Sequence, residues 1–194
     1  MNKSLLQGER VRLAAADPDR DSEAMAAWSR DSEFLRLLES QAARPWTTRG
    51  MQAVTTELQG KDEPDDTQYP FVIRLLADDR LIGMASLDVA PWPQREAWVA
   101  IALGARADWG RGYGTDAMRL LLRYAFAELN LARVSLVVFE YNPRAVRSYL
   151  KAGFEVEGRQ RERLRRDNRR WDMLFMGILR AGWLNQPAAP VQEA

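Results

Sequence analysis

A glycine-rich segment joining an apolar run to an amphipathic run has the residue types best suited to ligand binding. Its residues are, in order, Trp109, Gly110, Arg111, Gly112, Tyr113, Gly114 and Thr115. Glycines let the backbone turn tightly and let its N–H groups come close to a ligand. A helix that begins directly after them contributes about half a positive charge at its N-terminus. We therefore expect this segment to hold phosphate groups.

The spacing of the glycines distinguishes three kinds of phosphate-binding loop. A P-loop is excluded because no Lys follows these glycines. A dinucleotide-binding loop, Gly-x-Gly-x-x-Gly, matches Gly110 and Gly112 but finds Thr115 in its third place, although Glu140 could serve as the ribose-binding acid. The third pattern, Gln/Arg-x-x-Gly-x-Gly/Ala, holds the pyrophosphate of coenzyme A and matches both Gly112 and Gly114.

The sequence contains no Cys and no His, which narrows the chemistry. A Cys nucleophile, a Ser-His-Asp triad and a zinc site built from His or Cys are therefore excluded. Because no disulfide can form, nothing suggests secretion. Any catalysis must use carboxylates, Tyr, Ser, Thr, Lys, backbone amides or a bound cofactor.

Charge and hydropathy exclude other classes of partner. Lys plus Arg number 28 against 27 for Asp plus Glu, and a net charge of +1 gives no general attraction to nucleic acid or a membrane surface. The apolar runs are shorter than the ~20 residues that span a bilayer, and residues 1–10 lack the pattern of a signal peptide. We expect a soluble cytoplasmic protein with no metal.

The order of predicted elements indicates a mixed α/β sheet in one domain of residues 1–194. Strands are predicted near residues 11–13, 71–75, 81–89, 97–103 and 134–139, from 154 onward, and at 171–179. Helices are predicted over 22–38 in two pieces divided near Asp31, and over 47–60, 115–129 and 143–153. A front half of hairpins joined to a strand–helix–strand unit gives a sheet of mixed direction. The core covers about 6–180, with an acidic loop at 61–68 and a loose tail at 185–194.

From about residue 6 to 179 the sequence resembles the GNAT superfamily of N-acetyltransferases, in the branch of the ribosomal-protein acetyltransferases RimJ and RimL. Trp109 stands where the general superfamily pattern has Gln or Arg, a replacement familiar in this branch. Besides residues 109–115, the matching residues are Tyr124, Ala125, Phe126, Asn142, Ala145, Tyr149, Gly153, Phe154, Gly158, Asp167, Trp171, Asp172, Met176 and Gly177.

This resemblance implies a central, mostly antiparallel sheet with helices on both faces, in which two parallel strands splay apart to admit acetyl-CoA. The strand residues Ile101, Ala102 and Leu103 would pair with the pantetheine arm, and the amides of residues 110–115 would hold the pyrophosphate. Charge from Arg106 or Arg111 would face a phosphate, unless these are solvated surface cations. Asn142 and Ala145 would also contact the cofactor, while Asn142 caps the helix that Pro143 opens.

Transfer to an amine needs one group that gives a proton and one that takes a proton. The resemblance gives Tyr149 the first role, donating to the coenzyme A thiolate as it leaves, although a packing role would also explain this residue. Related enzymes often carry a Glu as base on the strand before the glycines, where this sequence has Trp98. Glu96 lies two residues earlier on the same side and is the candidate base, unless it is a surface carboxylate at a strand end. Asp172 is a further candidate.

Three functions remain open at this stage. The first is an enzyme that acetylates a protein N-terminus, a polyamine or a small amine, with acceptor contacts from the N-terminal helices (Trp28, Phe34 and Trp46) and the last hairpin, in a monomer or a homodimer. The second is a coenzyme A sensor without turnover. The third uses seven Arg within residues 159–170 to bind RNA or a ribosome, although a charged strand face also explains them and the near-zero net charge argues against nucleic acid.

Overall fold

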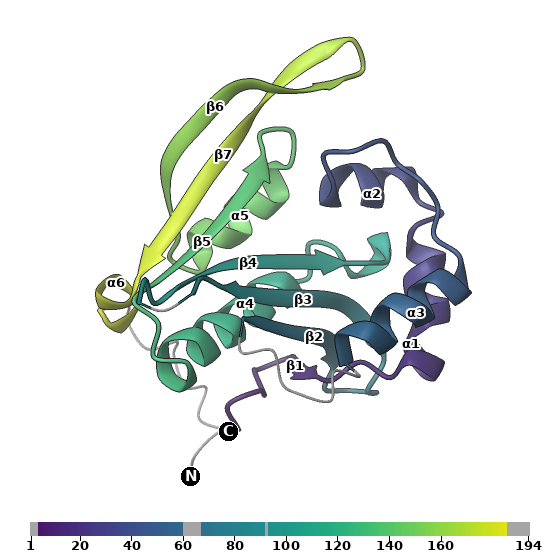
Figure 1. The fold of residues 1–194 in the computed structure, drawn as a ribbon, viewed down its shortest axis with the longest axis horizontal. Helices are drawn as coiled ribbons and strands as arrows, with labels where there is room; N and C mark the ends of the chain where they lie inside the picture. The colour runs from purple at the N-terminus through teal and green to yellow at the C-terminus, as the bar shows by residue number, and fades with distance from the viewer. Residues whose placement is uncertain (1–3, 60–66, 92, 186–194) are drawn as a thin grey trace.

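The computed structural model describes residues 4–59, 67–91 and 93–185. A seven-stranded sheet forms its centre, in the order β1-β2-β3-β4-β5-β7-β6 (Figure 1). Within these residues β4 and β5 run parallel, and every other neighbouring pair is antiparallel. The strands are β1 (Val11–Ala14), β2 (Gln68–Leu75), β3 (Leu81–Val89), β4 (Glu96–Leu103), β5 (Arg133–Phe139), β6 (Glu155–Arg166) and β7 (Arg169–Leu179). The predicted mixed α/β sheet is confirmed.

Helices cover both faces of this sheet (Figure 1). On one face Met118, Leu121 and Phe126 join the main core, which includes sheet residues such as Ile73 and Val134. On the other face a second cluster packs helical side chains against the sheet residue Val72. The helices are α1 (Pro18–Trp28), α2 (Ser32–Leu38), α3 (Thr48–Gln59), α4 (Tyr113–Arg123, followed by a π-helical turn, Tyr124–Glu128), α5 (Pro143–Lys151) and α6 (Arg180–Leu184).

Side-chain caps explain where several helices begin. Asp31 accepts a hydrogen bond from the backbone of Glu33 at the start of α2, and Asn142 accepts one of 3.2 Å from the amide of Ala145 at the start of α5. Thr47 accepts from the amide of Gly50 at 3.0 Å, just before α3. Each is a short polar side chain that satisfies amides left unpaired in the first helical turn, and the cap at Asn142 was predicted from the sequence.

The two edges of β4 are paired very differently. Along β3, β4 is paired from Ala97 to Leu103. Along β5, pairing covers only Glu96 to Trp98, and the last pair joins Trp98 to Ser135. Beyond that pair the two parallel strands separate into a fork, and the backbone groups on their facing edges are not used by the sheet.

The C-terminal region differs from the sequence prediction in two ways. The strand near residue 154 extends to Arg166 and pairs with β7 in a long hairpin that reaches beyond the rest of the sheet (Figure 1). Its register shifts between Gln160 and Leu164, and Glu162 has a φ of 52°, so the arginines of this strand do not form one regular charged face. The short helix α6 was not predicted. Most of the predicted loop at 61–68 and tail at 185–194 lies outside the described residues.

None of the helices in the described part of the chain is long and apolar enough to cross a membrane.

Candidate active site

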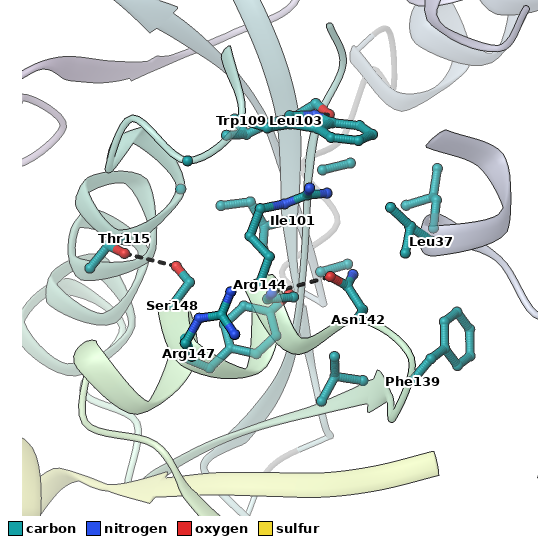
Figure 2. Close-up of a pocket in the computed structure, with 18 of the residues that line it drawn as sticks. Leu37, Ile101, Leu103, Trp109, Thr115, Phe139, Asn142, Arg144, Arg147 and Ser148 are labelled. Carbon is teal, nitrogen blue, oxygen red and sulfur yellow. Dashed lines mark hydrogen bonds between the residues drawn. The ribbon is translucent and has the colours of Figure 1, made fainter. Parts of the chain in front are cut away.

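A cavity of about 470 Å³ occupies the fork between β4 and β5. The C-terminal half of β4 and the end of β5 form its sides, α5 and the start of α4 border it, and α2 closes it with Phe34, Leu37 and Leu38. In Figure 2, Leu37 faces Asn142 and Arg144 across this space. The cavity therefore lies where the sheet leaves backbone groups without a strand partner.

The glycine-rich segment forms one end of the cavity. Gly110 and Gly112 have φ values of 76° and 85°, a region that favours glycine. Gly112 also begins α4 without a capping side chain, so the first amides of α4 are not covered. A Cβ at Gly114 would stand 3.6 Å from Leu103 Cδ1 and 3.8 Å from Ser148 Oγ, within the space between α4 and α5. The absence of side chains keeps this cradle open.

The inward face of α5 adds positive charge beside the glycines. Arg144, Arg147 and Lys151 all line the cavity, at spacings of three and four residues that place them on one helix face. No ion pair joins them to a carboxylate within residues 4–59, 67–91 and 93–185. Ser148, on the same face, shares a hydrogen bond of 2.8 Å with Thr115 of α4 (Figure 2). The two helices are thus held together where the charges gather.

Arg144 lies over the ring of Trp109, 3.9 Å from its centroid. Trp109 is fixed in turn, because its Nε1 donates a hydrogen bond of 2.8 Å to the carbonyl of Leu103. Removal of water from the guanidinium lowers the pKa of Arg144; the charge of Glu33 opposes this shift, and the charge of Arg106 adds to it. A desolvated cation with no paired carboxylate would be stabilised by an anion in the cavity.

Tyr149 lines the cavity from α5, where its ring contacts Phe154. Burial raises the pKa of Tyr149 to about 12, because an ionised hydroxyl would be poorly solvated there. The hydroxyl therefore keeps its proton at neutral pH and is available as a donor.

Comparisons with known proteins agree with this geometry. Residues 10–155 match the family model for the acetyltransferase (GNAT) domain. Bacillus subtilis "Probable N-acetyltransferase YjcK" is 31% identical over 163 residues, 83% of this chain and 89% of that protein. The spermidine N(1)-acetyltransferase of Vibrio cholerae is 32% identical over 130 residues, 67% of this chain and 74% of that protein. A crystal structure of spermidine N-acetyltransferase from Vibrio cholerae, in complex with CoA and spermine, superposes with a TM-score of 0.75 at 25% identity, covering 90% of this chain and 98% of that one.

The chain belongs to the GNAT acetyltransferases. It is an acetyl-CoA-dependent N-acetyltransferase, and acetyl-CoA is its acetyl donor. The residues present fit this donor. The cradle of Gly112 and Gly114 leaves space for a pyrophosphate, and a Cβ at either position would take up part of that space. The cations of α5 match the negative charge of its phosphates.

This GNAT chain brings most of the predicted site residues together in one cavity. They are Ile101, Ala102, Leu103, Trp109, Gly110, Gly112, Gly114, Thr115, Asn142, Ala145 and Tyr149. Arg111 and Tyr113 do not line the cavity, although they belong to the glycine-rich segment. Arg106 also lies outside it and forms ion pairs with Asp31 and Glu33.

Glu96, the predicted base, is placed away from the cavity. It is the first residue of β4, opposite Arg133 in the parallel pairing, and its charge raises the pKa of Arg133 together with the larger effect of Glu157. The cavity begins at Val99 on this strand. Asp172, the other candidate, pairs with Arg159 and accepts from the amide of Glu162, and these contacts lower its pKa. Within the described residues no carboxylate lines the cavity.

The aromatic residues named as candidates for acceptor contact divide into two groups. Phe34 lines the cavity, whereas Trp28 and Trp46 pack against Phe34 from behind. Trp28 also fills the space beside Gly104, where an added Cβ would overlap its ring at 2.0 Å. These two tryptophans thus support the wall instead of forming it.

Sequence reasoning missed the cations of α5 and the apolar residues of the opposite wall. Arg144, Arg147 and Lys151 could have been found from their helical spacing after the Asn142 cap. Leu37 could not, because nothing in a sequence states that α2 will close a fork formed much later in the chain. No group of three or more His, Cys, Asp or Glu side chains that could hold a metal ion is found in the part of the chain that the structure describes.

Proposed function

We propose that this acetyltransferase moves the acetyl group directly to a primary amine in a complex that holds both substrates at once. The fork cavity carries this proposal, because the glycine cradle, the α5 cations and Tyr149 all line one continuous space. The sequence contains no Cys, so an acetyl-enzyme on a thiol is excluded. The amine would enter from the end of the cavity opposite the cradle.

The donor would be held by rigid groups. The amides of residues 110–115 would bind its pyrophosphate, and Arg144, Arg147 and Lys151 would neutralise its phosphates. Backbone groups of Ile101 and Ala102 on the open edge of β4 would pair with the pantetheine arm. Asn142 would combine its capping role with a contact to the same arm. Such preorganised donors need little rearrangement when the ligand arrives.

Tyr149 would act as the proton donor to the leaving sulfur. The donor supplies an activated acetyl group: a bond forms between its carbonyl carbon and the amine nitrogen, and the carbon–sulfur bond breaks. Tyr149 would give its proton to the departing sulfur and regain the one that the nitrogen loses on becoming an amide. Because the pKa of Tyr149 is about 12, the tyrosinate would be basic enough to take that proton at once. The ammonium form of the amine must lose a further proton before it attacks.

Relatives point to more than one kind of acceptor. Two of them are spermidine acetyltransferases, whose names give a polyamine as acceptor. The residue run from Trp109 to Gly177 favours the RimJ and RimL branch, in which the acceptor is a protein N-terminus. A cytoplasmic location and a homodimer stay predictions.

Turnover with a panel of amines tests this proposal. The purified protein and acetyl-CoA would be supplied with N-terminal peptides, polyamines and aminoglycosides, and the acetylated product would be identified by mass spectrometry. We expect amine-dependent release of free coenzyme A, with intersecting double-reciprocal plots for the two substrates. Parallel plots, or protein that becomes acetylated in the absence of amine, would contradict direct transfer.

A further inference from the structure

The cavity continues onto an exposed apolar face of the sheet. Trp98 is 43% exposed and Val137 is 42% exposed. The Trp98 ring meets the ring of Phe175 edge-on, with centroids 6.4 Å apart, and Phe175 is paired in register with Val137. Single exposed apolar residues are ordinary, but a contiguous group beside a site indicates binding. We call these three residues the Trp98 face.

The Trp98 face begins where the fork opens. Trp98 and Ser135 form the last pair between β4 and β5, and the next residues on the same sides of these strands are Ala100 and Val137. Both Ala100 and Val137 line the cavity. A molecule that reaches the fork from the paired ends of β4 and β5, opposite the glycine cradle, therefore meets this face before the cavity.

The charges around this route offer few partners to a molecule with several ammonium groups. Among the described residues, all charged side chains that line the cavity are cations, and the nearby carboxylates are already paired with arginines. These pairs join Glu140 and Asp172 to Arg159, and Asp31 and Glu33 to Arg106.

One carboxylate beside the Trp98 face remains available. Asp88 of β3 stands opposite Trp98 in register and is exposed. Its Oδ2 accepts a hydrogen bond of 3.2 Å from the hydroxyl of Ser86, and within the described residues no cation pairs with it. An aromatic ring beside a carboxylate attracts a cation through both its π-face and the neighbouring charge.

We propose that the acceptor is a primary amine with one positive charge on an apolar body, such as an arylalkylamine or a peptide that begins with a large apolar residue. The apolar body packs on the Trp98 face, and Asp88 attracts the ammonium form as it arrives. A polyamine fits poorly, because its further ammonium groups would meet one carboxylate and otherwise apolar side chains. This inference rests on the proposed function and names the substrate class of the same site.

Steady-state kinetics on four amines test the inference. The amines are 2-phenylethylamine, a peptide that begins with Phe, the same peptide beginning with Ser, and spermidine. We expect kcat/KM for one of the first two to exceed that for spermidine by about tenfold or more, the usual size of an effect from a filled apolar pocket. Whichever of these two amines has the higher kcat/KM shows whether the acceptor is a small amine or the N-terminus of a peptide. Spermidine as the best substrate would overturn the inference.

Matched variants locate the effect. Trp98→Ala should lower kcat/KM for the preferred apolar amine about tenfold, with spermidine changed far less and acetyl-CoA affinity unchanged. Val137→Ala should lower it severalfold, whereas Val156→Ala, at a similarly exposed valine on β6 (51%), should have no effect. Asp88→Asn should raise KM for each charged amine. Equal losses of kcat/KM for both amines in Trp98→Ala, or equal kcat/KM in the two valine variants, would show that this face does not select the acceptor.

Binding separates failure of this inference from failure of the proposed function. Calorimetry would measure 2-phenylethylamine binding to the protein loaded with coenzyme A, for the wild type and for Trp98→Ala. Binding that is weakened by the substitution, without turnover of any amine, would refute direct transfer and retain the acceptor face. Absence of binding in the wild type would refute the acceptor face whatever the turnover.

Discussion

Polar groups are paired in the block of strands β1 to β4, whereas several are left unpaired in the fork between β4 and β5. In the block, β4 is paired along β3, and the buried guanidinium of Arg74 makes two hydrogen bonds of 2.7 Å to the carboxylate of Asp21. In the fork, pairing stops at Trp98, and Arg144 lies desolvated over the Trp109 ring, with no carboxylate of the described residues paired to it. Unsatisfied groups are costly in a protein interior, so a region that collects them is built to receive a partner.

Strand β4 shows both arrangements, because one of its edges is paired and the other is open. The part of the structure that stabilises the fold therefore lies directly beside the part that binds ligands. The β3 side of β4 keeps the fold together, and the β5 side keeps a site open. Substitutions in the block should therefore alter unfolding, and substitutions in the fork should alter ligand binding or turnover.

The largest effect is expected from Tyr149→Phe in the fork. Loss of the proposed proton donor should lower kcat by about 10² to 10⁴ while the Kd for acetyl-CoA changes little. Because the pKa of Tyr149 is raised to about 12, the hydroxyl is protonated below that pH, and the wild-type rate should not fall through its ionisation between pH 7 and 10. Unchanged kcat in the variant would remove Tyr149 from the mechanism.

The block should respond most strongly to Asp21→Ala. This change leaves the Arg74 side chain, 4% exposed, without its counter-charge and should lower the free energy of unfolding by about 3–5 kcal/mol in urea titrations. Glu157→Gln is the control, because its ion pair with Arg133 is 39% exposed on the Glu157 side and should contribute at most about 1 kcal/mol. Equal losses in the two variants would contradict the view of the block as the stabilising region.

Gly114→Val should weaken acetyl-CoA binding about a hundredfold without unfolding the chain. The φ of Gly114 is not positive and an added Cβ meets only ordinary contacts, so the backbone tolerates the change while the cradle is filled. Gly182→Val, at a glycine of α6 whose Cβ would meet open space, is the control. Calorimetry with coenzyme A measures both, and normal affinity in Gly114→Val would place the phosphates elsewhere.

Local signals account for what the sequence predicted well. The cap at Asn142, the periodicity of α4 and the glycines at 110–114 depend on residues close together in the chain, so element order and the cradle could be predicted. Resemblance to a known family then supplied the splayed strands.

Non-local pairing accounts for what the sequence did not predict. Alternation correctly gave Glu96 and Trp98 one side of β4, but where the fork begins depends on the register with β5, which no local pattern fixes. The Trp98 face forms because β7 lies beside β5, and Leu37 closes the cavity because α2 packs over the fork. Such features arise only when distant segments pack.

Arg144→Ala should weaken acetyl-CoA binding about tenfold, a moderate effect because Arg147 and Lys151 remain. The loss should shrink as salt is added, since screening reduces the contribution of each charge. Arg119→Ala, at an exposed arginine of α4, should leave the affinity unchanged at any salt concentration. A loss that does not depend on salt would point to the stacking on Trp109 instead of charge.

Glu96→Gln should have the smallest effect on turnover, within about twofold, because Glu96 precedes the cavity on β4 and lies beside Arg133. With no carboxylate lining the described part of the cavity, the amine would lose its proton to solvent. The rate at low amine concentration should then rise about tenfold per pH unit below the pKa of the amine itself and should follow that pKa when a less basic amine is used. The contrary result would be a rise in rate near pH 5 to 7 that is the same for every amine and that Glu96→Gln removes. Such a pH dependence would show that a protein carboxylate takes the proton, through water that reaches from the paired end of β4 into the fork.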